Sequence, residues 1–389
     1  MAMSFFKVLS LVSIVVMAML HSSFDVTSLS VNEEADVLLN WKATLQNETQ
    51  ATQPPLPSWT LPNYATNSSN NQNTSSIPCS WFGISCNQAR SVIGLNLTNS
   101  GLKGTLHGFS FSSLPNLAIL DLSMNGLFGT VPIEISNLSK LTLLDLSFNK
   151  LLGEIPSQIG LLTNLEDLHL AENQLNGSIP PGTGQLKSLT FLSLYANDLH
   201  GRIPASLGNL SKLVCLLLNN NFLSCSIPAS LCNLNNLVYL YPHHNQLYGS
   251  VPREIGNLSN LVELNMKNNS PTGHIPSSIG SLEKLTWLHI YDNLLFGSNP
   301  PEIGNLKSLF SLSFQFNNLS GSIPTSLGVL SNLTVLHLNG NLLSGTIPKE
   351  LGNLKSLISL QLDANQLNGT VPISLGNLSN LEVLFLCDN

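Results

Sequence analysis

Aromatic and imidazole side chains gather in the middle of this sequence, at positions that a strand would turn outward. They are His169, Phe191, Tyr195, Tyr239, Tyr241, His243, His244, Trp287, His289, Tyr291, Phe316 and His337. Such groups combine apolar area with hydrogen bonding, and exposed aromatic residues without a core to fill are typical of a partner surface. We therefore expect them to bind a ligand, and an extended peptide fits best. The competing interpretation is that large side chains merely decorate strands, which favour them.

The same residues offer little to catalysis. No nucleophile–base pair and no paired carboxylates stand in a pocket-forming context, so we expect no catalytic residue and no cofactor. A metal site at His243, His244 and His289 lacks a carboxylate or cysteine to complete the ligand set, and we expect no metal. Because imidazole titrates near pH 6.5, the histidines predict a ligand affinity that changes between pH 5 and 7. The 15 basic and 22 acidic residues include no basic run, which argues against nucleic acid.

A repeat of 24 residues must position these side chains. Its leading leucines recur at that spacing from Leu117 to Leu381, after an irregular first unit that begins near Val92. Within one unit, Leu336 and Leu338 alternate with exposed residues as in a strand. About 13 repeats of this length predict an α/β repeat solenoid, a leucine-rich-repeat superhelix with a parallel β-sheet on its concave face. The aromatic and histidine residues fall in repeats 4 to 11, most densely in repeats 7 to 9.

Asparagine recurs inside the unit, at the position of Asn341, in every regular repeat from Asn125 to Asn389. An inward amide must be hydrogen-bonded, so we expect a ladder in which each side chain bridges backbone groups of adjacent turns. Glycine at the position of Gly345 permits a tight turn.

Several units depart from the repeat. Pro242 takes an inward strand position normally held by leucine, Pro271 replaces a turn leucine, Asn299 replaces isoleucine, and repeat 4 contains Pro181 and Thr183. Proline lacks the N–H that a sheet requires, so Pro242 predicts a local disturbance within the expected binding strip. Drift away from the repeat is the competing explanation.

The chain divides into a signal peptide at 1–28, an N-terminal cap at 29–91 and the solenoid at 92–389, whose last repeat is incomplete. Lys7 and an apolar run to Leu20 are typical of a secretory leader, and no other stretch approaches the ~20 apolar residues of a membrane span. Leu38, Trp41 and Leu45 follow at helical spacing in the cap. We expect a secreted, extracellular chain.

Cysteines and sequons agree with secretion. Cys79 and Cys86 are close in sequence and are expected to pair, and Cys225 with Cys232 forms a second possible pair within one repeat. Cys215 and Cys387 have no obvious partner. Glycosylation sequons stand at Asn47, Asn67, Asn73, Asn96, Asn137, Asn176, Asn209, Asn257, Asn268, Asn318, Asn332, Asn368 and Asn377.

The unit Leu-x-x-Leu-x-Leu-x-x-Asn-x-Leu-x-Gly-x-Ile-Pro and the cap motif from Cys79 to Cys86, which contains Trp81 and Gly83, resemble the ectodomains of plant leucine-rich-repeat receptor-like kinases. The resemblance implies a receptor at the cell surface that senses an extracellular peptide or protein, usually on its concave side, and pairs with a co-receptor kinase. Members of that family continue into a transmembrane helix and a Ser/Thr kinase. This sequence shows neither, so we expect a truncated, non-catalytic sensing domain.

The alternative is a free secreted inhibitor of cell-wall-degrading enzymes, similar to the plant polygalacturonase-inhibiting proteins. Those proteins carry fewer repeats and a cysteine-paired C-terminal cap, which favours the receptor interpretation.

Overall fold

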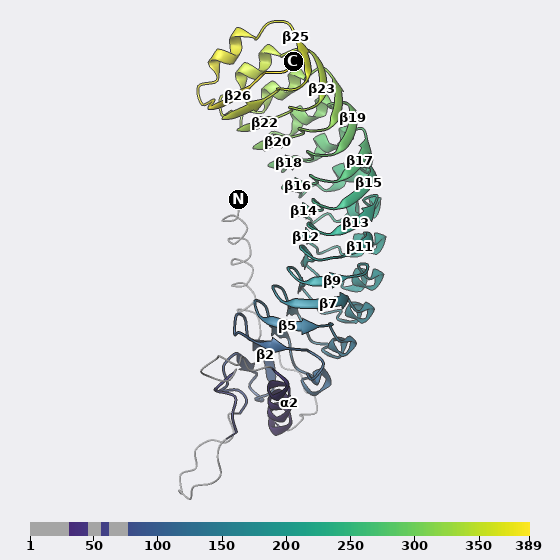
Figure 1. Ribbon diagram of the computed structural model, residues 1–389, viewed down its shortest axis with the longest axis vertical. Helices are drawn as coiled ribbons and strands as arrows, with labels where there is room; N and C mark the ends of the chain where they lie inside the picture. Colours follow the sequence, from purple (N-terminus) through teal and green to yellow (C-terminus); the bar gives the residue numbers. More distant parts are fainter. Residues whose placement is uncertain (1–30, 46–55, 62–76) are drawn as a thin grey trace, which may run out of the picture.

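The computed structural model describes residues 31–45, 56–61 and 77–389. The repeats stack into an arc, with the N-terminal cap at one end and the last repeat at the other (Figure 1). The predicted signal peptide at 1–28 lies outside the described residues. The arc agrees with the expected solenoid.

The inner face of the arc is a 14-stranded sheet in which each repeat contributes one strand. All neighbours are parallel except β1 (Ile84–Cys86), which runs antiparallel to the first repeat strand. The repeat strands are β2 (Val92–Asn96), β4 (Ile119–Asp121), β6 (Leu143–Asp145), β8 (Asp167–His169), β10 (Phe191–Ser193), β12 (Cys215–Leu217), β14 (Tyr239–Tyr241), β16 (Glu263–Asn265), β18 (Trp287–His289), β20 (Ser311–Ser313), β22 (Val335–His337), β24 (Ser359–Gln361) and β26 (Val383–Phe385). The predicted parallel sheet on the concave face is confirmed.

The outer side has a second layer of short strands, which the repeat pattern alone does not predict. A four-stranded sheet contains β3 (Lys103–Gly104), β5 (Gly126–Gly129), β7 (Lys150–Glu154) and β9 (Gln174–Asn176). An eight-stranded sheet contains β11 (His200–Arg202), β13 (Phe222–Cys225), β15 (Gln246–Ser250), β17 (Ser270–Gly273), β19 (Leu294–Ser298), β21 (Asn318–Gly321), β23 (Leu342–Thr346) and β25 (Gln366–Asn368).

Each coil then passes through a single-turn 3₁₀ helix before the next inner strand. These helices are η2 (Phe111–Ser113), η3 (Ile133–Asn137), η4 (Ser157–Leu161), η5 (Pro181–Gln185), η6 (Ala205–Asn209), η7 (Ala229–Asn233), η8 (Arg253–Asn257), η9 (Ser277–Ser281), η10 (Pro301–Asn305), η11 (Thr325–Val329), η12 (Lys349–Asn353) and η13 (Ile373–Asn377). The unusual Pro181 causes no break, because it opens η5 at a position where proline needs no N–H partner.

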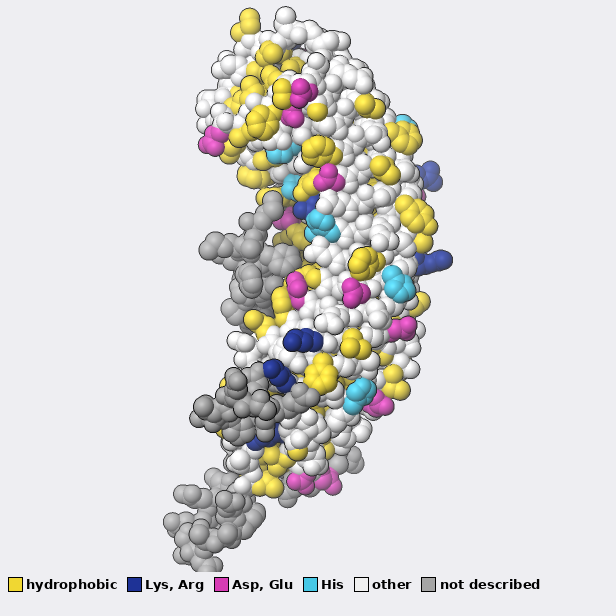
Figure 2. All heavy atoms as spheres, viewed as in Figure 1, with side chains coloured by type: hydrophobic (Ala, Val, Ile, Leu, Met, Phe, Trp, Pro, Cys, Tyr) yellow, Lys and Arg dark blue, Asp and Glu magenta, His cyan; other side chains and the backbone are white. Residues whose placement is uncertain are grey.

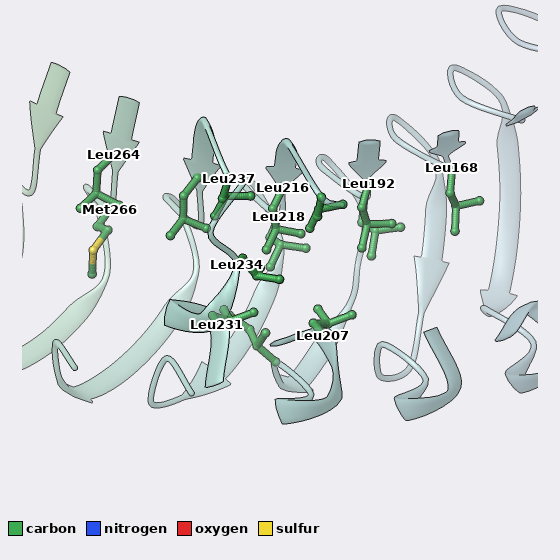
Figure 3. Packing of buried hydrophobic residues seen from close by; sticks show 14 of the residues in the cluster. Leu168, Leu192, Leu207, Leu216, Leu218, Leu231, Leu234, Leu237, Leu264 and Met266 are labelled. Atoms are coloured by element: carbon green, nitrogen blue, oxygen red, sulfur yellow. The ribbon is translucent and has the colours of Figure 1, made fainter. Parts of the chain in front are cut away.

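The core is a continuous column of leucines between the inner strands and the 3₁₀ helices. Leu192 and Leu216 reach it from β10 and β12, and Leu207 and Leu231 reach it from η6 and η7 (Figure 3). All four side chains are buried. Because one coil cannot enclose this set alone, each repeat depends on its two neighbours for burial.

The predicted asparagine ladder is present. The Asn341 amide nitrogen donates to the carbonyl oxygens of Phe314 and Leu338, both at 3.0 Å, and its amide oxygen accepts from the Leu319 N–H at 3.0 Å. Each rung therefore joins two successive coils. Loss of one rung would leave buried backbone groups unpaired, which costs roughly 1–3 kcal/mol.

Two departures from the repeat disturb this interior. Pro271 has no N–H for the Asn293 amide oxygen, which instead accepts from the Asn269 N–H at 3.1 Å. Asn299 is buried, 3% exposed, and neither its amide nitrogen nor its amide oxygen has a hydrogen-bond partner.

The cap closes the first repeat with aromatic side chains. Trp41 of α2 (Val31–Thr44) lies 5.0 Å from Phe109 between ring centroids, and Trp59 stacks on Trp81 at 5.5 Å. The buried Glu34 carboxylate accepts the Val92 N–H at 2.9 Å, which ties α2 to the first inner strand. The Cys79–Cys86 disulfide is formed, as predicted.

At the other end of the arc, hydrophobic side chains gather on the last repeat (Figure 2). Leu384 and Phe385 of β26 are exposed, as is Ile373 of η13. Elsewhere on the face in Figure 2, charged side chains are scattered, in keeping with the low charge of the chain.

Candidate functional site

Register on the inner sheet brings outward residues from successive repeats into columns. Tyr239 of β14 pairs with Glu263 of β16, and Glu263 pairs with Trp287 of β18. On the other side, Tyr239 pairs with Cys215 of β12, which pairs with Phe191 of β10. Neighbouring strands lie about 4.8 Å apart, so side chains distant in sequence meet on one surface.

These columns enclose a cavity of about 520 Å³ on the concave face. This volume is within the usual range for sites that bind compact ligands or the side chains of a partner. Its lining residues are Ser147, Phe148, His169, Ala171, Phe191, Ser193, Tyr195, Cys215, Leu217, Tyr239, Tyr241, His243, Glu263, Leu264, Asn265, Lys267, Trp287, His289 and Tyr291. We refer to this set as the concave cavity.

Most of the residues predicted from the sequence meet in the concave cavity. They are His169, Phe191, Tyr195, Tyr239, Tyr241, His243, Trp287, His289 and Tyr291. The sequence prediction centred the strip on repeats 7 to 9, whereas the cavity extends from repeat 3 to repeat 9. That these residues bind a ligand remains a prediction.

Three predicted residues lie outside the cavity. His244 stands in the turn after β14, and its Nδ1 lies 2.9 Å from the Asn268 amide nitrogen of the next coil. Phe316 holds the same turn position after β20, the first strand beyond the cavity, and is exposed. His337 lies on β22, also beyond the last strand of the cavity, and its Nε2 is 2.8 Å from the Ser359 hydroxyl oxygen.

Two residues of the apolar floor of the cavity, Cys215 and Leu217, were not predicted. Phe191, Cys215 and Leu217 form a buried cluster against Tyr195, Tyr239 and Tyr241. Cys215 and Leu217 stand at outward strand positions, but small apolar residues there are hard to tell from core leucines. They can be recognised as cavity residues because they are in register with Tyr239 and Tyr241 of β14.

Tyrosine hydroxyls in the cavity remain protonated donors. The Tyr241 hydroxyl donates to the Glu263 carboxylate. Burial, and then this hydrogen bond, raise the pKa of Tyr241 far above its usual range. Burial and the nearby Glu172 carboxylate raise the pKa of Tyr195 to about 12.

Two of the cavity histidines have pKa values below the range that the sequence suggested. Burial, with a contribution from Lys267, lowers the pKa of His243 to about 3 and the pKa of His289 to about 4. Burial also lowers the pKa of His169, and a nearby Asp167 carboxylate opposes this only in part. The expectation that imidazoles change charge between pH 5 and 7 is therefore wrong for His243 and His289.

The carboxyl group of Asp145 has its pKa in the range between pH 5 and 7. Asp145 of β6 pairs in register with Asp121 of β4 and with His169 of β8. Burial, and then the Asp121 charge, raise the pKa of Asp145 to about 6, although the Ser147 backbone N–H donates to it at 2.8 Å. Asp121 and Asp145 therefore form an acidic pair on the concave face, next to the cavity residues Ser147 and His169.

Pro242 interrupts the sheet beside the cavity, as predicted. Between β12 and β14, the Leu218 N–H donates to the Tyr241 carbonyl oxygen at 3.0 Å. Pro242 has no N–H for the equivalent carbonyl oxygen, that of Asn265. Consequently β14 and β16 are in register at two residue pairs, whereas β12 and β14 are in register at three.

The second possible pair, Cys225 with Cys232, is not formed, and both cysteines are free. Cys225 takes the place of the turn glycine on β13, with φ at +68°, and its sulfur lies 3.5 Å from the Tyr248 hydroxyl on the outer surface. Cys232 is buried in the core at η7. Cys215 and Cys387 are also free.

The sequons differ in accessibility. Asn47, Asn67 and Asn73 lie outside the described residues. Asn268 is half-buried against His244. The remaining sequon asparagines are exposed: Asn96, Asn137, Asn176, Asn209, Asn257, Asn318, Asn332, Asn368 and Asn377.

Two absences hold for the described part of the chain. Within it, no three His, Cys, Asp or Glu side chains come close enough together to hold a metal ion. Among the same residues, no helix has the length and apolar character needed to cross a membrane.

Comparison with known proteins gives one family. The family model of the leucine-rich repeat region matches residues 84–246 and 228–344. MDIS1-interacting receptor like kinase 2 of Arabidopsis thaliana is 46% identical over 125 residues, which are 32% of this chain and 10% of that protein.

Solved structures agree over most of the chain. The PEPR1–AtPEP1 structure superposes with a TM-score of 0.83 at 38% identity, and covers 91% of this chain and 48% of that one. The Arabidopsis receptor kinase HAESA, solved with the peptide hormone IDA and the co-receptor SERK1, has a TM-score of 0.54 at 26% identity, with 91% and 73% covered. The chain thus spans about half the length of PEPR1 in that structure and a tenth of the curated relative. It belongs to the leucine-rich-repeat family, in the form found in the ectodomains of plant receptor kinases.

Proposed function

We propose that this chain is an extracellular, non-catalytic sensing domain that binds a peptide in the concave cavity. The observation that carries the proposal is the cavity itself, about 520 Å³ lined by aromatic side chains from several repeats. These side chains point from the inner strands toward the concave surface, whereas the leucines of the same strands fill the core. Aromatic side chains that are not part of the hydrophobic core are the usual anchors of a binding surface.

The relatives support the class of ligand. PEPR1 and HAESA are solved with AtPEP1 and with the peptide hormone IDA, and HAESA also with the co-receptor SERK1. By analogy, this domain would bind a secreted peptide and then a co-receptor kinase at the plant cell surface. An extended peptide also suits a row of parallel strands, because its alternate side chains can enter successive columns.

Exposed sequons and the Cys79–Cys86 disulfide support an extracellular location. The predicted signal peptide at 1–28 is consistent with export. A membrane anchor and a kinase in the full-length protein belong to the same proposal.

Capture of secreted plant peptides on the immobilised chain tests the function. The double variant Tyr241→Ala/His243→Ala removes two side chains of the cavity wall, and we expect capture to fall at least ~10-fold, as for loss of an aromatic anchor. The matched control is Phe222→Ala/Tyr248→Ala, which removes two exposed aromatic residues from the outer sheet. Equal losses in both variants, or none in the first, would place the site elsewhere.

The alternative function, inhibition of a cell-wall-degrading enzyme, gives a different result in the same assay. In that case the chain would retain a secreted hydrolase rather than a peptide, and the retained hydrolase would lose activity.

A further inference from the structure

Lys267 supplies a positive charge to the concave cavity without a carboxylate partner. It is the lone lysine or arginine among the lining residues. Its ammonium group lies 5.3 Å from the centroid of the Tyr291 ring, and no carboxylate of the described residues is within ion-pair distance. Glu263, which also lines the cavity, is engaged by the Tyr241 hydroxyl.

Two imidazoles flank this charge in the neighbouring repeats. His243 lines the cavity one repeat before Lys267, and its Nδ1 atom is buried without a hydrogen-bond partner. His289 lies one repeat later, with Nε2 2.9 Å from the Ser311 hydroxyl oxygen. A buried polar atom without a partner is costly, and a ligand group that supplied one would remove that cost.

Asn265 adds a polar group to this part of the cavity. It pairs in register with His289, and its side-chain oxygen accepts the Lys267 backbone N–H at 3.4 Å. Among the described residues its amide nitrogen has no hydrogen-bond acceptor, so it is available as a donor to a ligand. Lys267, His243 and Asn265 together offer one full positive charge and several donors, but no anion.

The apolar floor lies beside this group. Leu217 is on β12 and Lys267 follows β16, two strands further along the sheet. At about 4.8 Å per strand, β12 and β16 are roughly 10 Å apart, a distance that an extended peptide spans in about three residues. The cavity therefore has an apolar end and a cationic end at a separation that one short peptide segment can bridge.

We infer that the end of the concave cavity around Lys267, His243 and Asn265 is a subsite for an oxyanion of the ligand, about three residues from an apolar side chain seated on Phe191, Cys215 and Leu217. The inference rests on the proposed function, because it defines the peptide that this cavity would take. A side-chain carboxylate, a C-terminal carboxylate and a sulfate ester share this chemistry. Charge-assisted hydrogen bonds to such a group are stronger than those between neutral partners.

A displayed library of random 12-residue peptides tests the subsite while the natural ligand is still unidentified. On the full chain we expect enrichment of Asp or Glu about three positions from Phe, Leu or Ile. The variant Lys267→Met should lose the acidic preference and keep the apolar one, whereas Lys267→Arg should restore the acidic preference. Lys284→Met is the matched control, since Lys284 is exposed and its ammonium group bonds Asn260 outside the cavity.

An enriched peptide then gives the magnitude and separates the sources of the anion. Replacing its Asp by Asn should weaken binding at least ~10-fold on the wild-type chain and have little effect on Lys267→Met. Amidation of the C-terminus, and sulfation of a tyrosine, test the other two sources on the same peptide.

The outcomes separate this inference from the proposed function. Apolar enrichment without acidic enrichment, or an acidic preference that survives in Lys267→Met, overturns the subsite and leaves peptide sensing intact. Acidic enrichment that depends on Lys267, with no capture of secreted plant peptides, supports the subsite and counts against peptide sensing. A library that yields no enriched peptide overturns both.

Discussion

Replacing Asp145 by asparagine should stabilise the solenoid at neutral pH and leave its stability nearly unchanged in acid. Asp145 lies on the concave sheet beside the Asp121 carboxylate, and its pKa is raised from 3.8 to about 6, mainly by burial. A carboxyl group with a raised pKa binds its proton more tightly in the folded chain than in the unfolded one. Its ionisation therefore destabilises the fold as the pH increases.

The size of the effect follows from the two pKa values. The pKa rises from 3.8 in the unfolded chain to about 6 in the folded one, and each pKa unit corresponds to about 1.36 kcal/mol. The wild-type chain should thus lose up to ~3 kcal/mol between about pH 4 and pH 6, relative to a chain without this group. Asparagine has a similar shape, cannot ionise, and keeps an oxygen that accepts the Ser147 N–H.

Urea unfolding followed by circular dichroism at pH 3.5 and pH 7 measures the difference between the two chains. We expect Asp145→Asn to be more stable than wild type by ~2–3 kcal/mol at pH 7 and equal to it at pH 3.5. Asp198→Asn, at an exposed position, should follow the wild-type pH dependence. If Asp145→Asn gives the same difference at both pH values, the reasoning from buried charge fails.

Three further predictions, two substitutions and one measurement of glycosylation, concern the interior and the surface. Asn299→Ile should stabilise the chain by ~1–3 kcal/mol, because it removes two unpartnered buried amide atoms; a lower midpoint in urea would contradict this. Pro271→Leu should add ~1 kcal/mol by restoring an N–H donor for the Asn293 amide oxygen, with thermal unfolding as the measurement and an unchanged Tm as the adverse result. In a chain secreted from a glycosylating host, mass spectrometry of peptides should find Asn268 unmodified and exposed sequons such as Asn209 modified, since Asn268 is half-buried against His244; full occupancy of Asn268 would show that folding does not protect it.

The periodicity of the sequence was sufficient to predict the fold, because a given position of the repeat has the same environment in every coil. The spacing of 24 residues placed Leu192 and its equivalents in the core, and the inward Asn341 had to find hydrogen-bond partners in the adjacent coil. The same pattern said nothing of the outer strands. Their pairing depends on backbone groups that every residue carries, apart from proline.

The candidate site was harder to predict, since it depends on contacts between repeats. The pKa of His243 depends on burial among residues one repeat away, including Lys267. His244 differs from His243 only by one position, but its ring contacts Asn268 in the next coil and does not line the cavity. Leu217 has the character of a core residue and becomes part of the floor only through its register with Tyr241.

The departures from the repeat indicate how a solenoid can acquire a site without losing its fold. Pro271 and Asn299 lie on the side of the coil away from the inner strands, and the ladder compensates for Pro271 by accepting the Asn269 N–H. In a structure held together by nearest neighbours, such a defect weakens one interface and leaves the others unchanged. Pro242 is the same kind of defect placed beside the concave cavity, where it removes one sheet hydrogen bond between β14 and β16.

Local stability is thus lower at the strand that carries Tyr241 than in its neighbours, and a ligand that bridges β14 and β16 would recover part of it. Binding should therefore protect the backbone amides of these two strands from hydrogen exchange more than those of β8 and β10, which also line the cavity but pair in full register. Amide exchange followed by mass spectrometry, with and without an enriched peptide, measures the difference. Uniform protection along the sheet would refute this view of Pro242, because a defect confined to one interface can be repaired only there.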